Sequence, residues 1–534
     1  MDDFIKILAI GTHWFDTSWK DAKIPGKKPY EDDEEYRGDY ILEYAQYQYF
    51  TAPARHLVFS DTAGDVTKNF EFRYNGQKLR NSGRYEIYKN NEVFTLNINN
   101  IKLRLYNTGV AMLIFELEYH GDKKIDGNKD ETPPSLDDVN KINEYGRRIC
   151  FPFIPEKGKG HPINADKIVI DVGEKQFTED NVETLKKFHE SFGANGGAMS
   201  LTHMMDPIKE IIECGSGFTI TSSVKRHDLG AYFVYPVIDD RMFVCCLVRD
   251  NDFIKSLNQW KDTEYSYLSD CDSPEHETSD KLYKFGFIEN YASCQNRAMK
   301  KEILKKCVNA RWADDDTIYM ATHHSFTAVT KVDESQRAYV VNPFLTQYVE
   351  LAIIALAQRA TLLSLTAQAA SLASTFRQDK LIGAAEIAEI AKLHEKYVKA
   401  QNQILIFTAT AQEQGVELFD LMRSQLYISK NEAELDAQLK NLYEISNIND
   451  DRLNRESDAR LNDLITIFTI FGLIFAVMQV TQNLFCTYNS INFLLSLLLS
   501  AAITSILVLA YYRVYRRYLY PIYRRYFPKK GGQA

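Results

Sequence analysis

The fold is decided by an uncharged stretch that reads LITIFTIFGLIFAVMQVTQNLF at 464–485, CTYNS at 486–490 and INFLLSLLLSAAITSILVLAYY at 491–512. A helix needs about 20 apolar residues to cross a hydrocarbon core about 30 Å thick, and both long segments reach that length. A buried helical hairpin in a soluble protein is the alternative, but both segments are apolar all round, which favours lipid. The stretch therefore predicts a transmembrane hairpin.

Basic residues after the second span orient this hairpin. The segment 513–534 contains no acidic residue and carries Arg513, Arg516, Arg517, Arg524, Arg525, Lys529 and Lys530. Basic residues beside a span stay on the cytoplasmic side of the membrane. Because two spans return the chain to its starting side, we expect residues 1–463 and the basic tail 513–534 to be cytoplasmic, with the loop 486–490 outside.

The rest of the chain is long enough for a domain with its own core. The chain has 534 residues, a net charge of −9 and 45% hydrophobic residues. This acidic balance excludes a general DNA-binding or RNA-binding protein, which would need a basic surface.

Residues 1–342 show a mixed pattern that predicts a cytoplasmic α/β domain. Alternating residues on both sides of Asn107-Thr108-Gly109 predict a hairpin over 101–119. We also predict a second hairpin over 231–248, a helix over 181–192 and an exposed loop over 120–136. Further short apolar runs predict strands at 5–10, 56–59, 70–74, 85–88, 93–98, 167–172, 218–221, 282–288 and 317–322.

Residues 343–463 predict a helical stalk region, because proline is absent from Phe344 to Leu464 and Ala, Leu, Gln and Glu dominate. We predict helices over 345–374, 380–428 and 431–485. The first is apolar, but Glu350, Gln358, Arg359 and Gln368 would be costly in lipid, so a packed amphipathic helix is preferred to a third span.

The last of these helices has no breaker between Glu432 and the first span, which makes it about 80 Å long. Leu435, Leu439 and Leu442 begin a heptad-like stripe along it. Such a helix would couple the cytoplasmic domain rigidly to the bilayer.

Two spans cannot enclose a pore, so transport would require several subunits around one axis. Small and polar residues recur at spacings of three and four on one face of the first span, namely Thr469, Gly472, Ala476, Gln479 and Asn483. This face predicts either a pore lining or a tight seam between helices. No acidic ring is available within the spans.

This arrangement resembles the CorA metal-ion transporter superfamily, and most of all its divergent CorA-like members that accompany type III CRISPR systems. The resemblance covers about residues 340–530, with looser matches at Arg311-Trp312-Ala313, Thr317-Ile318-Tyr319 and Thr322-His323-His324-Ser325. It implies a funnel-shaped homopentamer in the inner membrane of a prokaryote, with the first span lining the pore. It also implies a nucleotide second messenger, such as S-adenosylmethionine-AMP, as the gating ligand in antiviral defence.

The superfamily's Gly-Met-Asn signature is absent, and only an asparagine, Asn483 or Asn492, stands as its counterpart. Because that motif is associated with hydrated magnesium, its loss argues against Mg²⁺ selectivity. Three hypotheses follow: a ligand-gated channel that dissipates ion gradients, a divalent-cation transporter of the Mg²⁺ type, and a membrane-anchored binding protein or enzyme without a pore.

Ligand-binding candidates are few, because the sequence has no glycine-rich phosphate loop. Arg147 and Arg148 stand before an aromatic segment and could clamp a phosphate. His323 and His324 could also contact a ligand. Ser325 lacks a recognisable base and oxyanion loop, so no enzymatic activity is expected. Asp314-Asp315-Asp316 lacks the spacing of a calcium loop and reads as a solvated turn.

Overall fold

The computed structural model describes residues 2–11, 20–21, 46–58, 70–73, 83–106, 108–148, 155–173, 175–195, 207–208, 211, 218–220, 232–236, 241–261, 263–273, 275–291, 293–333, 336–375, 384–485 and 502. The chain divides into two compact units, Met1–Gln378 with Ala388–Tyr443, and Asp379–Ile387 with Glu444–Ala534. The predicted second span, the predicted basic tail and Asn492 lie outside the described residues.

The first unit contains a mainly antiparallel sheet in the order β10-β9-β4-β5-β6-β1-β13-β18-β17-β16. The pair β13–β18 is parallel. The strands on this path are β1 (Asp2–Gly11), β4 (Arg84–Lys89), β5 (Glu92–Leu105), β6 (Val110–Tyr119), β9 (Lys167–Asp171), β10 (Gln176–Asp180), β13 (Phe243–Arg249), β16 (Val308–Asn309), β17 (Thr317–Ala321) and β18 (Ser325–Thr330).

Shorter strands branch from this sheet or pair apart from it. They are β2 (Lys20–Asp21), β3 (Phe70–Arg73), β7 (Lys123–Ile125), β8 (Asn128–Asp130), β11 (Phe218–Ile220), β12 (Tyr232–Pro236), β14 (Trp260–Lys261) and β15 (Glu264–Tyr265). The predicted hairpin over 101–119 is confirmed, since β5 and β6 pair with Ile101 opposite Phe115. The predicted loop 120–136 is wrong in part, because β7 and β8 form a small hairpin there.

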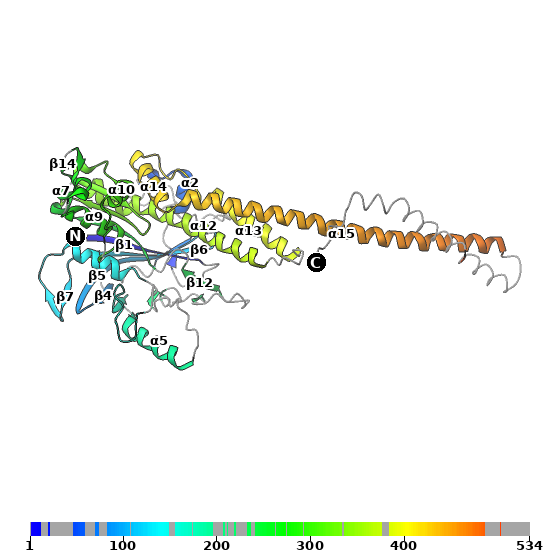
Figure 1. Cartoon of the computed structure of the whole chain (residues 1–534), viewed down its shortest axis with the longest axis horizontal. Helices are drawn as coiled ribbons and strands as arrows, with labels where there is room; N and C mark the ends of the chain where they lie inside the picture. The colour runs from blue at the N-terminus through cyan, green and yellow to red at the C-terminus, as the bar shows by residue number, and fades with distance from the viewer. Residues whose placement is uncertain are drawn as a thin grey trace, which may run out of the picture. The chain divides into compact units, whose positions relative to one another are not determined.

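Both faces of this sheet are buried under helices. Alternate residues of β6 divide between two hydrophobic clusters, as Leu113 and Phe115 do on one face and Met112 and Ile114 on the other. The first face is covered by α4 (Leu136–Gly146), α7 (Asn251–Asn258), α9 (Glu277–Phe287) and α10 (Arg297–Cys307), whereas α2 (Ala52–Val58), α12 (Val349–Thr375) and α14 (Glu413–Gln425) contribute to the second cluster (Figure 1). A three-layer α/β unit results.

The other helical elements are α5 (Asn181–Asn195), α8 (Ser266–Ser269), η2 (Asp270–Asp272), η3 (Ala313–Asp315), η4 (Arg337–Val341), η5 (Phe344–Tyr348), α13 (Ala384–Gln403) and α15 (Ile428–Phe485). The helix predicted over 181–192 is confirmed as α5. The strands predicted at 56–59 and 282–288 are wrong, because these runs lie in α2 and α9 or at their ends. The second hairpin is also wrong: β12 pairs with β1 and β11, whereas β13 pairs with β1 and β18.

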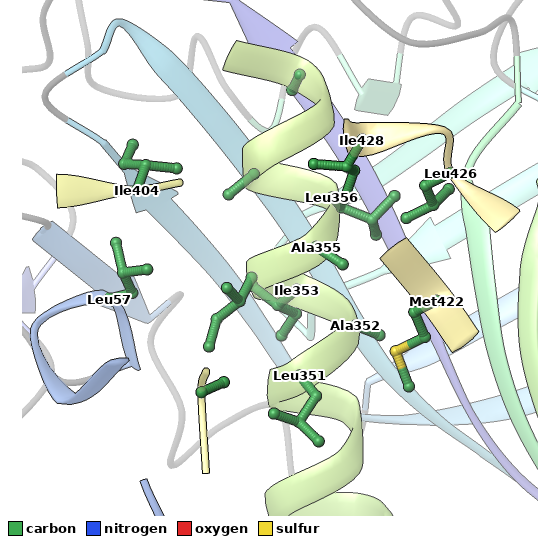
Figure 2. Packing of buried hydrophobic residues seen from close by; sticks show 14 of the residues in the cluster. Leu57, Leu351, Ala352, Ile353, Ala355, Leu356, Ile404, Met422, Leu426 and Ile428 are labelled. Carbon is green, nitrogen blue, oxygen red and sulfur yellow. The ribbon is translucent and has the colours of Figure 1, made fainter. Parts of the chain in front are cut away.

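Helix α12 forms the centre of the second core. Figure 2 shows Leu57 of α2 on one side of α12, and Met422, Leu426 and Ile428 on the other. Among the described residues, one helical stretch, Ala338–Ser374, is long and apolar enough to cross a membrane, but 72% of its apolar window is buried inside the protein. That burial is typical of a core helix. The predicted packing of this segment is confirmed, but it is not amphipathic over its first half, which is buried all round.

The polar residues that argued against a third span each have a buried partner. Glu350 forms a two-pronged ion pair with Arg104 of β5, with 2.8 Å between Arg104 Nη2 and Glu350 Oε1. The Gln358 side-chain amide donates to the carbonyl oxygens of Ile404 and Ile406 at 2.8 and 2.9 Å. These partners compensate the cost of burying polar groups in the core.

The helix predicted over 380–428 is wrong, because residues 404–412 interrupt it between α13 and α14. This segment is held by the rest of the unit instead. The Thr51 amide donates to the Ala409 carbonyl at 2.9 Å, and Phe50 pairs with Thr410 in an isolated antiparallel β-bridge. The helix predicted over 431–485 is confirmed as α15 and begins three residues earlier. At 58 residues it is about 87 Å long.

The first turns of α15 belong to the core of the first unit. Leu435, Leu439 and Leu442, which begin the predicted stripe, are buried in the second cluster. Tyr397 of α13 donates to Asp436 at 3.5 Å, and His394 stacks on Tyr443 with 5.3 Å between ring centroids. Helix α15 is therefore anchored on one side by α13.

Candidate functional site

The structure brings the four sequence-predicted ligand residues to one end of the sheet. Arg147 and Arg148 directly follow α4, whose start is set by a capping box between Ser135 and Asp138. His323 and His324 form the turn between β17 and β18. Arg241, which precedes β13, joins the pairs. We call Arg147, Arg148, Arg241, His323, His324 and Arg359 of α12 the Arg–His cluster.

Backbone and side-chain contacts connect the members of this cluster. Arg241 pairs with Arg148 in an isolated antiparallel bridge, and its Nη2 lies 3.1 Å from His324 Nε2. The rings of His323 and His324 meet edge to face, with 5.2 Å between their centroids. Arg359 contacts the His323 ring nitrogen and donates to the His323 carbonyl oxygen at 3.3 Å. The cluster is continuous from α4 to α12.

The two predicted arginines are more buried than a phosphate clamp requires. Arg147 is 1% exposed, and its Nη2 donates to the Ile288 carbonyl oxygen at 2.9 Å. Arg148 is 7% exposed. Arg147 therefore helps to join α4 to the end of α9, and a phosphate could reach it only if neighbouring groups moved. His323, His324 and Arg241 are partly exposed.

Two carboxylates balance part of the positive charge. Desolvation raises the pKa of the Glu144 carboxyl above its ordinary value, although the Asn290 amide, Arg147 and Arg148 each act to lower it. Desolvation also raises the pKa of Glu289, with Arg147 and Arg241 acting in the opposite direction. Local pattern does not reveal this charge balance, because Glu289 follows α9 and is far from the arginines along the chain.

His323 connects this cluster to the start of α15. Its Nδ1 lies 3.1 Å from the carbonyl oxygen of Gln425, the last residue of α14, and its ring lies 5.6 Å from that of Tyr427. A carbonyl can only accept and a guanidinium can only donate, so Nδ1 carries the proton and Nε2 accepts from Arg359. His323 is thus neutral in this arrangement. Tyr427, with φ 54°, makes the left-handed turn directly before α15.

Replacement of His323 by alanine is expected to lower the free energy of unfolding by about 1–3 kcal/mol. The substitution removes the ring nitrogens to which the Gln425 carbonyl and the 8%-exposed Arg359 hydrogen-bond. Thermal unfolding of the purified protein measures this loss. His120→Ala, which removes a partly exposed histidine beside Glu118, is the matched control and should change stability by less than about 0.5 kcal/mol. Equal effects would contradict the role given to His323.

The other polar motifs have structural partners. Ser325 is fully buried and hydrogen-bonds to Thr322 and to the Gly286 carbonyl oxygen, so it is not a nucleophile in this arrangement. Asp316 accepts from Asn258 at 2.5 Å and pairs with Lys331 at 3.5 Å at the end of η3. No group of three or more metal-ligating side chains occurs among the residues that the structure describes.

The predicted pore-facing residues all lie on α15. In the single chain Thr469, Ala476 and Gln479 are exposed, and the space beside Gly472 is open. The Thr469 hydroxyl donates to the Ile465 carbonyl oxygen of its own helix at 2.7 Å. Asn483 lies on the same helix. Their common face follows from their spacing.

Comparison with known proteins adds no relative to this description. No protein-family model, no curated protein and no solved structure matches the chain.

Proposed function

We propose that this protein is a homo-oligomeric, ligand-gated membrane channel of the CorA-like kind. Its parts are a cytoplasmic α/β sensor, a helix that enters the bilayer and a pore formed by several copies. The ligand is a small nucleotide messenger, and opening dissipates ion gradients, as in type III CRISPR defence. The single observation that carries this proposal is the continuity of α15. The same helix starts in the buried core at Ile428 and runs into the uncharged segment that begins at Leu464.

Exposed apolar side chains on the second half of α15 support the membrane part of the proposal. Leu464, Ile465, Phe468, Phe471 and Phe475 are each between 53% and 72% exposed in the single chain. Soluble monomers rarely expose so much contiguous apolar surface, so this part of the helix needs lipid or another helix around it. A membrane and further copies of the chain would supply both.

The contacts at the start of α15 support the gating part. The Gln425 carbonyl, Tyr427 and His323 link the Arg–His cluster to the residues directly before α15. A ligand that binds one arrangement of this junction better than another would shift the population of α15 orientations. The pore widens if the two arrangements of the junction place the first spans at different distances from the axis.

Ion flux from liposomes that contain the purified protein tests the proposal. We expect flux only after a nucleotide ligand is added, and a loss of at least about tenfold when Gln479, on the proposed pore face, is replaced by leucine. The control is Ile467→Val, because Ile467 is exposed and stands two residues before Thr469, a spacing that turns it away from that face. Ligand-independent flux with Mg²⁺ would favour a divalent-cation transporter. Absence of flux from an oligomer under all conditions would leave a membrane-anchored binding protein.

A further inference from the structure

A cleft of about 570 Å³ lies on the first unit, away from the sequence-predicted ligand residues. Its walls come from the start of α14 at Gln412–Gly415, from Arg311 and Trp312 beside η3, and from the end of η5 at Tyr348. Its volume is within the range of small-molecule sites, about 300–1,000 Å³.

Aromatic rings form one part of this lining. Trp312 is 41% exposed, although large apolar side chains are usually covered. Tyr49 and Tyr348 stand edge to face, with 6.4 Å between ring centroids. Gly415 permits this close packing, because a Cβ there would lie 1.9 Å from the Tyr49 hydroxyl oxygen. Tyr348 is 6% exposed and belongs to the second core, so Trp312 is the ring that offers a planar ligand a surface on which to stack.

Side-chain amides form the other part. Gln48, Gln347, Gln412 and Gln414 all line the cleft. Each amide presents a donor and an acceptor side by side, and this pair matches the edge of a nucleobase, as a glutamine matches N6 and N7 of adenine. Gln412 precedes the first turn of α14 and makes no side-chain cap bond to it. Its amide is therefore not engaged in capping that helix.

The charges that line the cleft cancel. Arg311 pairs with Glu413 at 3.0 Å and also with Glu417 of the same helix. Its guanidinium carbon lies 5.9 Å from the centre of the Trp312 ring, which holds that ring beside the cleft. A guanidinium already shared by two carboxylates is a weak partner for a phosphate. The lining therefore suits a neutral ring better than an anion.

We infer that this cleft is a binding site for a neutral, planar heterocycle of the nucleobase class, adenine in the first instance. The ring stacks against the exposed Trp312, and the amides of Gln347 and Gln412 bond to its edge. Aromatic stacking combined with hydrogen bonds to base edges is the usual way in which proteins hold unpaired bases.

Helix α14 connects the cleft to the junction before α15. Its first turn lines the cleft, and its last residue, Gln425, accepts from His323. The helix has 13 residues and buries Leu418, Phe419 and Met422 in the core. The idea that a ligand in the cleft acts on α15 through α14 rests on the proposed function. The binding itself does not.

Equilibrium dialysis of the full chain in detergent with adenosine tests the site. We expect saturable binding of adenosine, none of ribose 5-phosphate, and binding weakened about tenfold or more by Trp312→Ala. Trp260→Ala is the matched control, because Trp260 is 60% exposed and lies in β14, outside the cleft. Gln412→Leu should also weaken binding, and thermal unfolding shows whether each variant is folded.

Each outcome decides a different point. Equal binding by Trp312→Ala and the wild-type chain, or binding of ribose 5-phosphate but not of adenosine, would overturn the assignment of the cleft. Adenosine binding that depends on Trp312, without any ligand-induced ion flux, would keep the site and remove the proposed channel. Flux induced by a nucleotide and unchanged by Trp312→Ala would keep the channel and remove the link between the cleft and α15.

Discussion

Replacement of Glu350 by alanine will lower the free energy of unfolding by about 3–5 kcal/mol. The change leaves Arg104, which is 4% exposed, as a buried charge without its carboxylate partner. This pair joins β5 to α12, so its loss also loosens the central helix of the second core. Thermal or denaturant unfolding of the first unit measures the effect.

A double variant tests whether the loss of stability comes from leaving one buried charge without its partner. Arg104→Met with Glu350→Leu removes both charges and should recover most of the lost stability, because apolar residues of similar size often replace a buried pair at little cost. Glu395→Ala removes one partner of the exposed pair with Lys399 and should change stability by less than about 0.5 kcal/mol. If Glu350→Ala behaved like Glu395→Ala, the buried pair would not hold α12 to the sheet.

Replacement of Leu435 by alanine will cost about 2–5 kcal/mol. Leu435 is fully buried at the start of α15, where truncation leaves a cavity between α15 and the second core. The same change should weaken any coupling between the α/β unit and the membrane segment. Unfolding of the first unit and ligand-induced flux, measured on the same variant, report the two effects.

Leu461→Ala provides the comparison, because it truncates the same side chain on the same helix where it is 55% exposed. It should leave the stability of the first unit unchanged within about 0.5 kcal/mol. Similar losses in both variants would mean that the start of α15 is not an anchored part of the core.

The order of apolar, polar and turn residues along the chain predicted those helices and strands for which it fits only one type of element. Helix α15 follows from the absence of any breaker, and the hairpin of β5 and β6 from its alternation and turn. The runs at 56–59 and 282–288 are too short and apolar to distinguish a strand from a helix, and burial against the sheet makes them helical. The interruption at 404–412 depends on Thr51 and Gln358, which are far away along the chain.

The candidate site was predictable only in part. Arg147, Arg148, His323 and His324 stand out by type, and the structure places them together. Their burial and their links to Arg241, Arg359 and Gln425 follow from the sheet order, which no local pattern contains. The glutamines of the cleft carry no motif, because an amide side chain shows its use only when others converge on it.

The most direct test of the central claim is single-particle imaging of the full chain purified in detergent. The account predicts several copies around one axis, with α15 of each copy entering the detergent belt and Gln479 facing the axis. A particle with one copy, or one in which the segment from Leu464 to Phe485 lies outside the belt, would contradict it.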